Sequence, residues 1–91
     1  MLTDDVLYGD VWRRTELSPR DRSLVTIAAL AAMGDEDQLD FHLRRGIESG
    51  LTKDQIAEAV IQVGFYAGWP KATKALGATV RILGQSTEPG R

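Results

Sequence analysis

The sequence contains no cysteine and only one histidine among its 91 residues. Without cysteine the chain can form no disulfide, no thiolate metal site and no thiol redox centre. A single histidine also excludes the His-rich zinc sites of small domains. A chain this short buries only about 60–65% of its unfolded surface and usually needs a disulfide, a metal or a partner chain. Because oligomerisation is the source of stability that is left, we expect a homo-oligomer without a metal.

A strong charge of one sign and long apolar runs are also missing. Eleven Lys and Arg against thirteen Asp and Glu give a net charge of −2, and no basic run exceeds two residues. The sequence therefore lacks the cluster of basic residues that is typical of a nucleic-acid-binding protein. The apolar runs are far shorter than the roughly 20 residues that span a bilayer, and the acidic N-terminus is unlike the cationic start of a signal peptide. We therefore expect a cytoplasmic protein that binds neither nucleic acid nor membrane.

Helix-capping residues divide the chain into four main helices and a short N-terminal one. The expected helices cover residues 4–8, 19–33, 35–49, 53–67 and 70–83. Ser18 before Pro19 and the capping box from Thr52 to Gln55 are typical helix starts, and Gly34 is a typical C-cap. No segment alternates as a strand does. We expect an all-α fold, a small helical bundle forming one domain over 1–83, with a disordered polar tail over 84–91.

Two of these helices are apolar around most of their circumference. Residues 24–33 read LVTIAALAAM, in which Thr26 is the only polar side chain, and residues 53–67 are nearly as apolar. A helix that is apolar all round is expected to be buried on all sides. A bundle of 91 residues has too little mass to cover two such helices, which again indicates a further subunit.

His42 is the one side chain that titrates near neutral pH without help. On a helix with 3.6 residues per turn it lies beside a buried stripe of Leu39, Leu43 and Ile47, with Gln38 one turn before it. A histidine in this position can face a half-buried pocket. It can equally be a packing or surface residue.

Arginine and aromatic side chains supply further candidates. The pair Arg44 and Arg45 can bind an anionic substrate or the carboxylates of a partner, or it can lie on a solvated helix face. Arg22 belongs to an arginine-rich stretch that can clamp a carboxylate bidentately or form ion pairs between subunits. Three aromatic residues flank breaks at glycine or proline, namely Trp12, which is expected in a loop or a brief turn, Tyr66 and Trp69. Aromatic side chains at such positions anchor a core or an interface or contact a ligand.

Several short motifs follow one another in a specific order. They are R-S-L-V-T at 22–26, H-L-R at 42–44, G-L-T at 50–52 and Y-A-G-W-P at 66–70. Over residues 9–83 the sequence resembles the carboxymuconolactone decarboxylase family. The resemblance implies an all-helical protomer of the alkylhydroperoxidase D-like type, assembled as a trimer or hexamer. In the peroxidase-like branch the motif C-x-x-C-x-x-x-H occurs where this chain has Asp35, Gln38 and His42. Thiol peroxidase activity is therefore excluded, and the chain resembles the cysteine-free decarboxylase branch.

This resemblance implies a carboxy-lyase of aromatic-compound degradation that acts on a small lactone or keto acid without a cofactor. In γ-carboxymuconolactone the carbon that loses CO₂ is conjugated through a C=C bond to the lactone carbonyl. The electron pair left behind by CO₂ can therefore spread into this carbonyl, and no cofactor is needed to accept it. The protein then has to hold the carboxylates, stabilise the oxyanion and deliver a proton. By resemblance, His42 is the proton donor, Arg44 a carboxylate or interface contact, and Gln38 a polar pocket residue. The full set of expected substrate-binding residues is Gln38, Arg44, Arg22, Tyr66 and Trp69.

Some positions depart from the family pattern. A second histidine is common where Gly77 stands, and an acid is common where Gln38 stands. Most of the usual N-terminal helical extension is also missing. These departures support an alternative, a non-catalytic oligomeric binding or scaffold member of the same family. An unrelated helical interaction module is a third hypothesis.

Overall fold

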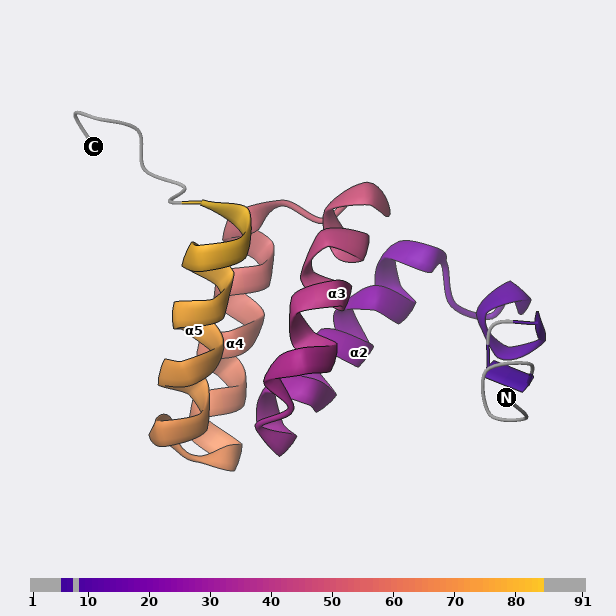
Figure 1. Ribbon diagram of the computed structural model, residues 1–91. Helices are drawn as coiled ribbons and strands as arrows, with labels where there is room; N and C mark the ends of the chain where they lie inside the picture. Colours follow the sequence, from indigo (N-terminus) through magenta and orange to yellow (C-terminus); the bar gives the residue numbers. More distant parts are fainter. Residues whose placement is uncertain (1–5, 8, 85–91) are drawn as a thin grey trace.

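The computed structural model describes residues 6, 7 and 9–84, and this part of the chain is helical without a strand. A 3-10 turn, η1 (Val11–Arg13), is followed by α2 (Pro19–Met33), α3 (Glu36–Glu48), α4 (Lys53–Ala67) and α5 (Trp69–Leu83). Figure 1 shows α4 and α5 side by side, α2 behind α3, and the segment before α2 at one side of the bundle. The all-α bundle is confirmed. Residues 4, 5 and 8 of the expected N-terminal helix and the polar tail beyond Gly84 lie outside the described residues.

Helices α2 and α4 have the predicted bounds, whereas α3 is one residue shorter at each end and α5 begins one residue earlier, at Trp69. The hydroxyl of Ser18 accepts a hydrogen bond from the backbone N–H of Asp21 at 3.0 Å, at the start of α2. Thr52 and Gln55 form both hydrogen bonds of the capping box that begins α4. Gly34 ends α2 with φ +76°, a backbone conformation that favours glycine. Local sequence chemistry therefore accounts for the helix boundaries.

The core lies between the four α-helices. Its buried hydrophobic side chains are Ile27, Ala31, Leu39, Leu43, Leu51, Ile56, Val60, Ala72, Ala75 and Ala78. The alanines of α5 are small enough to let this helix approach its neighbours closely. In the last turn of α4, a Cβ on Gly64 would overlap the ring of Trp69, so a larger residue there would have to displace this ring.

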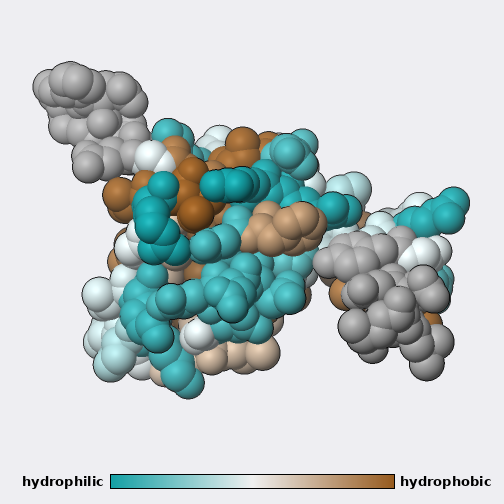
Figure 2. All heavy atoms as spheres, viewed as in Figure 1, coloured by the Kyte–Doolittle hydropathy of each residue, from teal (hydrophilic) through white to brown (hydrophobic). Residues whose placement is uncertain are grey.

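The two helices that were expected to be buried on all sides are covered on one side only. Within α2 the buried side chains are Ser23, Ile27 and Ala31, whereas Val25 and Met33 are 59% and 67% exposed. The other helices of one chain cover only one side of α2, as expected for a bundle of this size, and complete burial by a further subunit stays a prediction. Figure 2 shows a mostly hydrophilic face over α3, with hydrophobic atoms gathered near the C-terminal end of α5. None of the described helices is both long enough and apolar enough to cross a bilayer.

Candidate functional site

His42 lies in the middle of α3 and is almost completely buried, with an exposed fraction of 4%. Leu39 and Leu43 on the same helix fill the core and turn this side of α3 inward. The Nδ1 atom of His42 is buried and has no hydrogen-bond partner within the described part of the chain. A buried polar atom without a partner costs about 1–3 kcal/mol. Such a cost calls for an explanation, and ligand binding is one.

Aromatic rings and one arginine surround this imidazole. The indole of Trp12, from η1, stacks on His42 with 6.1 Å between ring centroids and 15° between planes. Phe41 meets His42 edge-on, at 5.0 Å and 85°. The guanidinium carbon of Arg45 lies 5.1 Å from the centroid of the Trp12 ring and 5.9 Å from that of Phe41. We refer to Trp12, Phe41, His42 and Arg45 as the His42 cluster.

Arg22 of α2 supplies a second buried nitrogen without a partner. Its Nε atom has no hydrogen-bond partner among the described residues, while its Nη2 donates to the carbonyl oxygen of Arg14 at 3.3 Å. Arg14 directly follows η1, and Trp12 of the same turn covers His42. The segment over residues 12–14 therefore contacts both residues that carry an unpartnered buried nitrogen.

The surroundings of His42 disfavour its protonated form. Burial lowers the pKa of His42 below its ordinary value of 6.5, and the positive charge of Arg45 lowers this pKa further. Both effects act against a second positive charge in a poorly solvated position. The imidazole is therefore neutral at neutral pH, and a nearby anion would favour its protonation.

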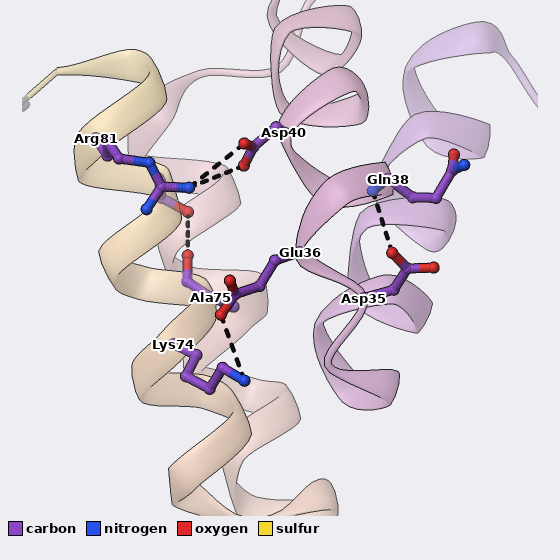
Figure 3. A network of polar contacts seen from close by, with 8 residues as sticks. Asp35, Glu36, Gln38, Asp40, Lys74, Ala75 and Arg81 are labelled. Carbon is purple, nitrogen blue, oxygen red and sulfur yellow. Dashed lines mark hydrogen bonds and ion pairs between the residues drawn. The ribbon is translucent and has the colours of Figure 1, made fainter.

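Two residues expected at the site lie elsewhere on α3. Gln38 has an exposed side chain, and its backbone N–H donates to the carboxylate of Asp35 at 3.1 Å, which caps the helix (Figure 3). Arg44 is exposed and, two residues after His42, points about 160° away from it around the helix. The single chain does not bring Arg44 to His42.

Arg44 instead lines an open groove of about 460 Å³ on the outer side of α3. The groove is lined by Asp37, Asp40, Phe41, Arg44, Arg45, Glu48 and Ile82. Beside it, Arg81 pairs with Asp40 at 3.1 Å and Lys74 pairs with Glu36 at 3.4 Å, which ties α3 to α5 (Figure 3). Exposed pairs of this kind contribute about 0–1 kcal/mol each. The groove thus carries charges of both signs and adjoins the His42 cluster through Phe41 and Arg45.

Tyr66 and Trp69 lie at the turn between α4 and α5. The side chain of Tyr66 is 84% exposed. The Trp69 ring packs against Phe65, with 4.8 Å between centroids and 74° between planes, and against Gly64. In the single chain these aromatic residues form a surface patch on α4 and α5, separate from the His42 cluster.

Sequence reasoning missed Phe41, and it named Trp12 and Arg45 as candidates without including them in the expected site. Helical spacing was a signal for Arg45, because a residue three positions after His42 lies on the same side of the helix. Trp12 was expected in a loop or brief turn, which η1 confirms, but its stack on α3 depends on tertiary packing. Among the described residues, no group of three or more side chains is placed to hold a metal ion.

Comparison with known proteins identifies a family and several relatives. Residues 2–81 match the model of the carboxymuconolactone decarboxylase family. A 4-carboxymuconolactone decarboxylase of Acinetobacter baylyi is 45% identical over 69 residues, which are 76% of this chain and 52% of the relative. The nitrosuccinic acid decarboxylase npaB of Metarhizium robertsii is 30% identical over 83 residues, 91% of this chain and 58% of the relative. The chain thus spans only slightly more than half the length of these two relatives.

Proposed function

The chain belongs to the carboxymuconolactone decarboxylase family, as its ordered motifs indicated, and from that premise we propose that it is a cofactor-free decarboxylase of a small unsaturated lactone or keto acid. Similarity to two decarboxylases supports this activity. The observation that carries the proposal is His42, a buried titratable side chain whose Nδ1 has no partner among the described residues.

The proposed reaction needs no external electron acceptor. In a butenolide that carries a carboxylate on its γ carbon, the bond between these carbons breaks and CO₂ leaves. The electron pair stays on the γ carbon and spreads through the C=C bond into the lactone carbonyl, which gives a furanolate-like dienolate. A proton then adds to the α carbon beside the carbonyl. The protein contributes by stabilising the developing oxyanion and by supplying that proton.

His42 supplies the proton and Arg22 holds a carboxylate of the substrate. The buried Nε of Arg22 is a donor without a partner in the described chain, and a carboxylate would satisfy it with a charge-assisted hydrogen bond. The negative charge of a bound acid also opposes the effect of Arg45 and raises the pKa of His42. Binding of the substrate thus charges the group that later donates the proton.

CO₂ release from γ-carboxymuconolactone tests the activity. We expect turnover by the native protein and a loss of about 100-fold or more in His42→Gln, the range that a positioned acid contributes. Arg81→Gln changes one exposed side chain of α5 and is the control, expected to keep the native rate. An unchanged rate in His42→Gln would remove His42 from the mechanism.

We also propose that the chain forms a homo-oligomer, a trimer or hexamer, through its exposed apolar faces. Val25 and Met33 of α2 and Phe65 and Tyr66 of α4 are each more than half exposed. Exposed apolar groups that gather on a face support a protein partner, and a second copy fits the expectation for this family. Residues of the α4–α5 patch would then serve as interface contacts.

A non-catalytic binding or scaffold protein is the second candidate function. Gly77, where a second histidine is common in the family, is exposed and has nothing within 4 Å of where a Cβ would lie. A site with one titratable side chain can bind an acid without transforming it. Binding of γ-carboxymuconolactone without CO₂ release would favour this function.

A further inference from the structure

We propose that the outer face of α3 is a two-fold contact between two copies of this chain, in which Asp37 of each copy pairs with Arg44 of the other around a central pair of Phe41 rings. The inference goes beyond the proposed reaction and does not depend on it. It also concerns a face other than the apolar faces of α2 and α4.

Four exposed side chains form one narrow stripe on α3, which we call the α3 stripe. Its residues are Asp37, Phe41, Arg44 and Glu48, and their spacing places them within about 60° of one another around the helix. The buried residues of α3 lie on the opposite side of the helix. In Figures 1 and 2, α3 lies in front of α2, and the face over α3 is mostly hydrophilic. The stripe is therefore the side of α3 that points away from the core.

The charges of the α3 stripe have no partner in the single chain. Asp37, Arg44 and Glu48 form no ion pair with any residue that the structure describes. Asp37 is followed one turn later by Asp40 and Phe41, so its own helix offers it no cation there. Two neighbouring acids of α3, by contrast, do pair with cations of α5 (Figure 3). The stripe thus presents charges of both signs that a second molecule can pair.

Phe41 gives these charges an apolar centre. The residue is 53% exposed, although its ring also meets His42 edge-on. It lies between Asp37 and Arg44 along the helix and lines the same groove of about 460 Å³. An aromatic side chain at the centre with charged side chains at the rim is typical of a protein–protein contact.

Two-fold symmetry determines how two such stripes fit together. Both copies use the same patch, so when Asp37 of one copy meets Arg44 of the other, the reverse pair forms as well. Two antiparallel helices satisfy both pairs when the axis passes midway between residues 37 and 44. The axis then lies beside Phe41, and the two Phe41 rings cover each other. One rotation therefore forms two ion pairs and buries the exposed ring.

Other arrangements of the α3 stripe fit less well. A parallel two-fold contact would set each charge against the same charge of the other copy, which is repulsive. An antiparallel contact between Arg44 and Glu48 would move the axis to Gly46 and leave Asp37 and Phe41 uncovered. The stripe thus favours the contact centred at Phe41, with Glu48 beyond its paired part.

The contact predicts an assembly with an even number of copies. An isologous two-fold contact joins chains in pairs, whereas a contact around a three-fold axis joins them in threes. If the apolar faces of α2 and α4 form a trimer, the α3 stripe joins two trimers into a hexamer. Without such a trimer, the stripe alone gives a dimer.

Charge reversal tests the contact by light scattering at micromolar concentration. We expect the native protein to have the mass of an even number of copies. Asp37→Arg or Arg44→Asp should halve that mass, because each reversal sets like charges against each other at both pairs. The double variant, which exchanges the two charges, should regain the native mass. Glu48→Arg makes the same acid-to-arginine change beyond the paired part and is the control, expected to keep the native mass.

Mixing the two single variants gives a second test. Asp37→Arg carries two cations at the paired positions and Arg44→Asp carries two anions, so the two chains complement each other although neither pairs with itself. An equimolar mixture should regain the native mass, with both chains present in equal number by native mass spectrometry. A general loss of folding in either variant would not produce this result.

Several outcomes would overturn the inference. They are a native mass of a monomer or a trimer, a mass that both single reversals leave unchanged, a mixture that stays at half the native mass, and a halved mass in Glu48→Arg. The measurement is a mass, so a failure of CO₂ release would count against the proposed reaction alone. Met33→Glu and Phe65→Glu change the faces of α2 and α4 and should leave chains joined in pairs through α3.

Discussion

Trp12 and His42, which lie far apart in the sequence, stack with their ring planes 15° apart. The stack joins the segment before α2 to the middle of α3 and covers a histidine that is also packed against Phe41. The buried imidazole combines two properties, a polar atom without a partner in the described chain and a charge state that depends on its neighbours. Both properties have measurable consequences.

The stability of the fold should fall in mild acid because of His42. Burial and Arg45 lower the pKa of His42 in the folded chain, while in the unfolded chain it keeps its ordinary value near 6.5. Between these two values the unfolded chain binds more protons, so the free energy of unfolding rises with pH through this window and falls as the pH drops. Urea unfolding at a series of pH values from about 5 to about 8 measures this slope.

His42→Gln provides the comparison for that slope. Glutamine does not titrate, so the difference between the two unfolding curves isolates the contribution of His42 from that of the carboxylates. We expect the native protein to lose more stability than the variant as the pH falls below about 6.5. If the free energy of unfolding changed with pH in the same way in both proteins, His42 would have the same pKa in the folded and the unfolded chain.

Gly64 and Gly77, both within helices, should respond in opposite directions to the same added methyl group. In Gly64→Ala the new Cβ would overlap the ring of Trp69, so we expect a loss of about 1–3 kcal/mol. In Gly77→Ala the Cβ meets nothing within 4 Å, so the higher helix propensity of alanine should add about 0.5–1 kcal/mol. Chemical denaturation of both variants measures the difference, and equal effects would show that the Trp69 contact does not constrain this turn.

The helices and the family could be predicted from the sequence because both depend on local signals. Ser18, Thr52 and Gly34 act through hydrogen bonds and backbone angles within a few residues, and the helices begin and end at them. The position of His42 beside the core stripe also follows from the helical repeat. In the structure its burial is greater than this position alone indicates, because Trp12 from another segment covers it.

The composition of the site could be predicted only in part. The motif H-L-R singled out Arg44. Successive residues are about 100° apart around a helix, so Arg44 and Arg45 point in different directions, and Arg45 is the arginine that reaches the His42 cluster. Tyr66 and Trp69 were grouped with the site by the resemblance, and in the single chain they form a surface patch. A part in assembly belongs to the proposed oligomer, in which a neighbouring copy would cover them, and one sequence does not position such a copy.

Assembly should depend on the exposed apolar side chains of α2 and α4. We expect Met33→Glu and Phe65→Glu, at positions 67% and 72% exposed, to shift the protein toward the monomer in light scattering. A charge in a buried subunit contact costs several kcal/mol unless it is paired. Thr15→Glu places the same charge at an exposed polar position outside the helices and is the comparison, expected to leave the assembly unchanged. A native protein that is already monomeric at micromolar concentration would contradict the proposed assembly.

Kinetics should distinguish the roles of Arg22 and His42. If Arg22 holds a carboxylate in the substrate and in the transition state alike, Arg22→Gln should raise KM while kcat changes little. If His42 delivers the proton only after CO₂ has left, His42→Gln should lower kcat by about 100-fold or more while KM changes little, provided that proton delivery limits the rate.

Arg81→Gln, which removes an arginine that pairs with Asp40 on the surface, is the matched control for the loss of charge. A fall in kcat alone for Arg22→Gln would mean that Arg22 acts on the developing negative charge. It would then belong to oxyanion stabilisation, and the carboxylate contact would have to be assigned to another residue.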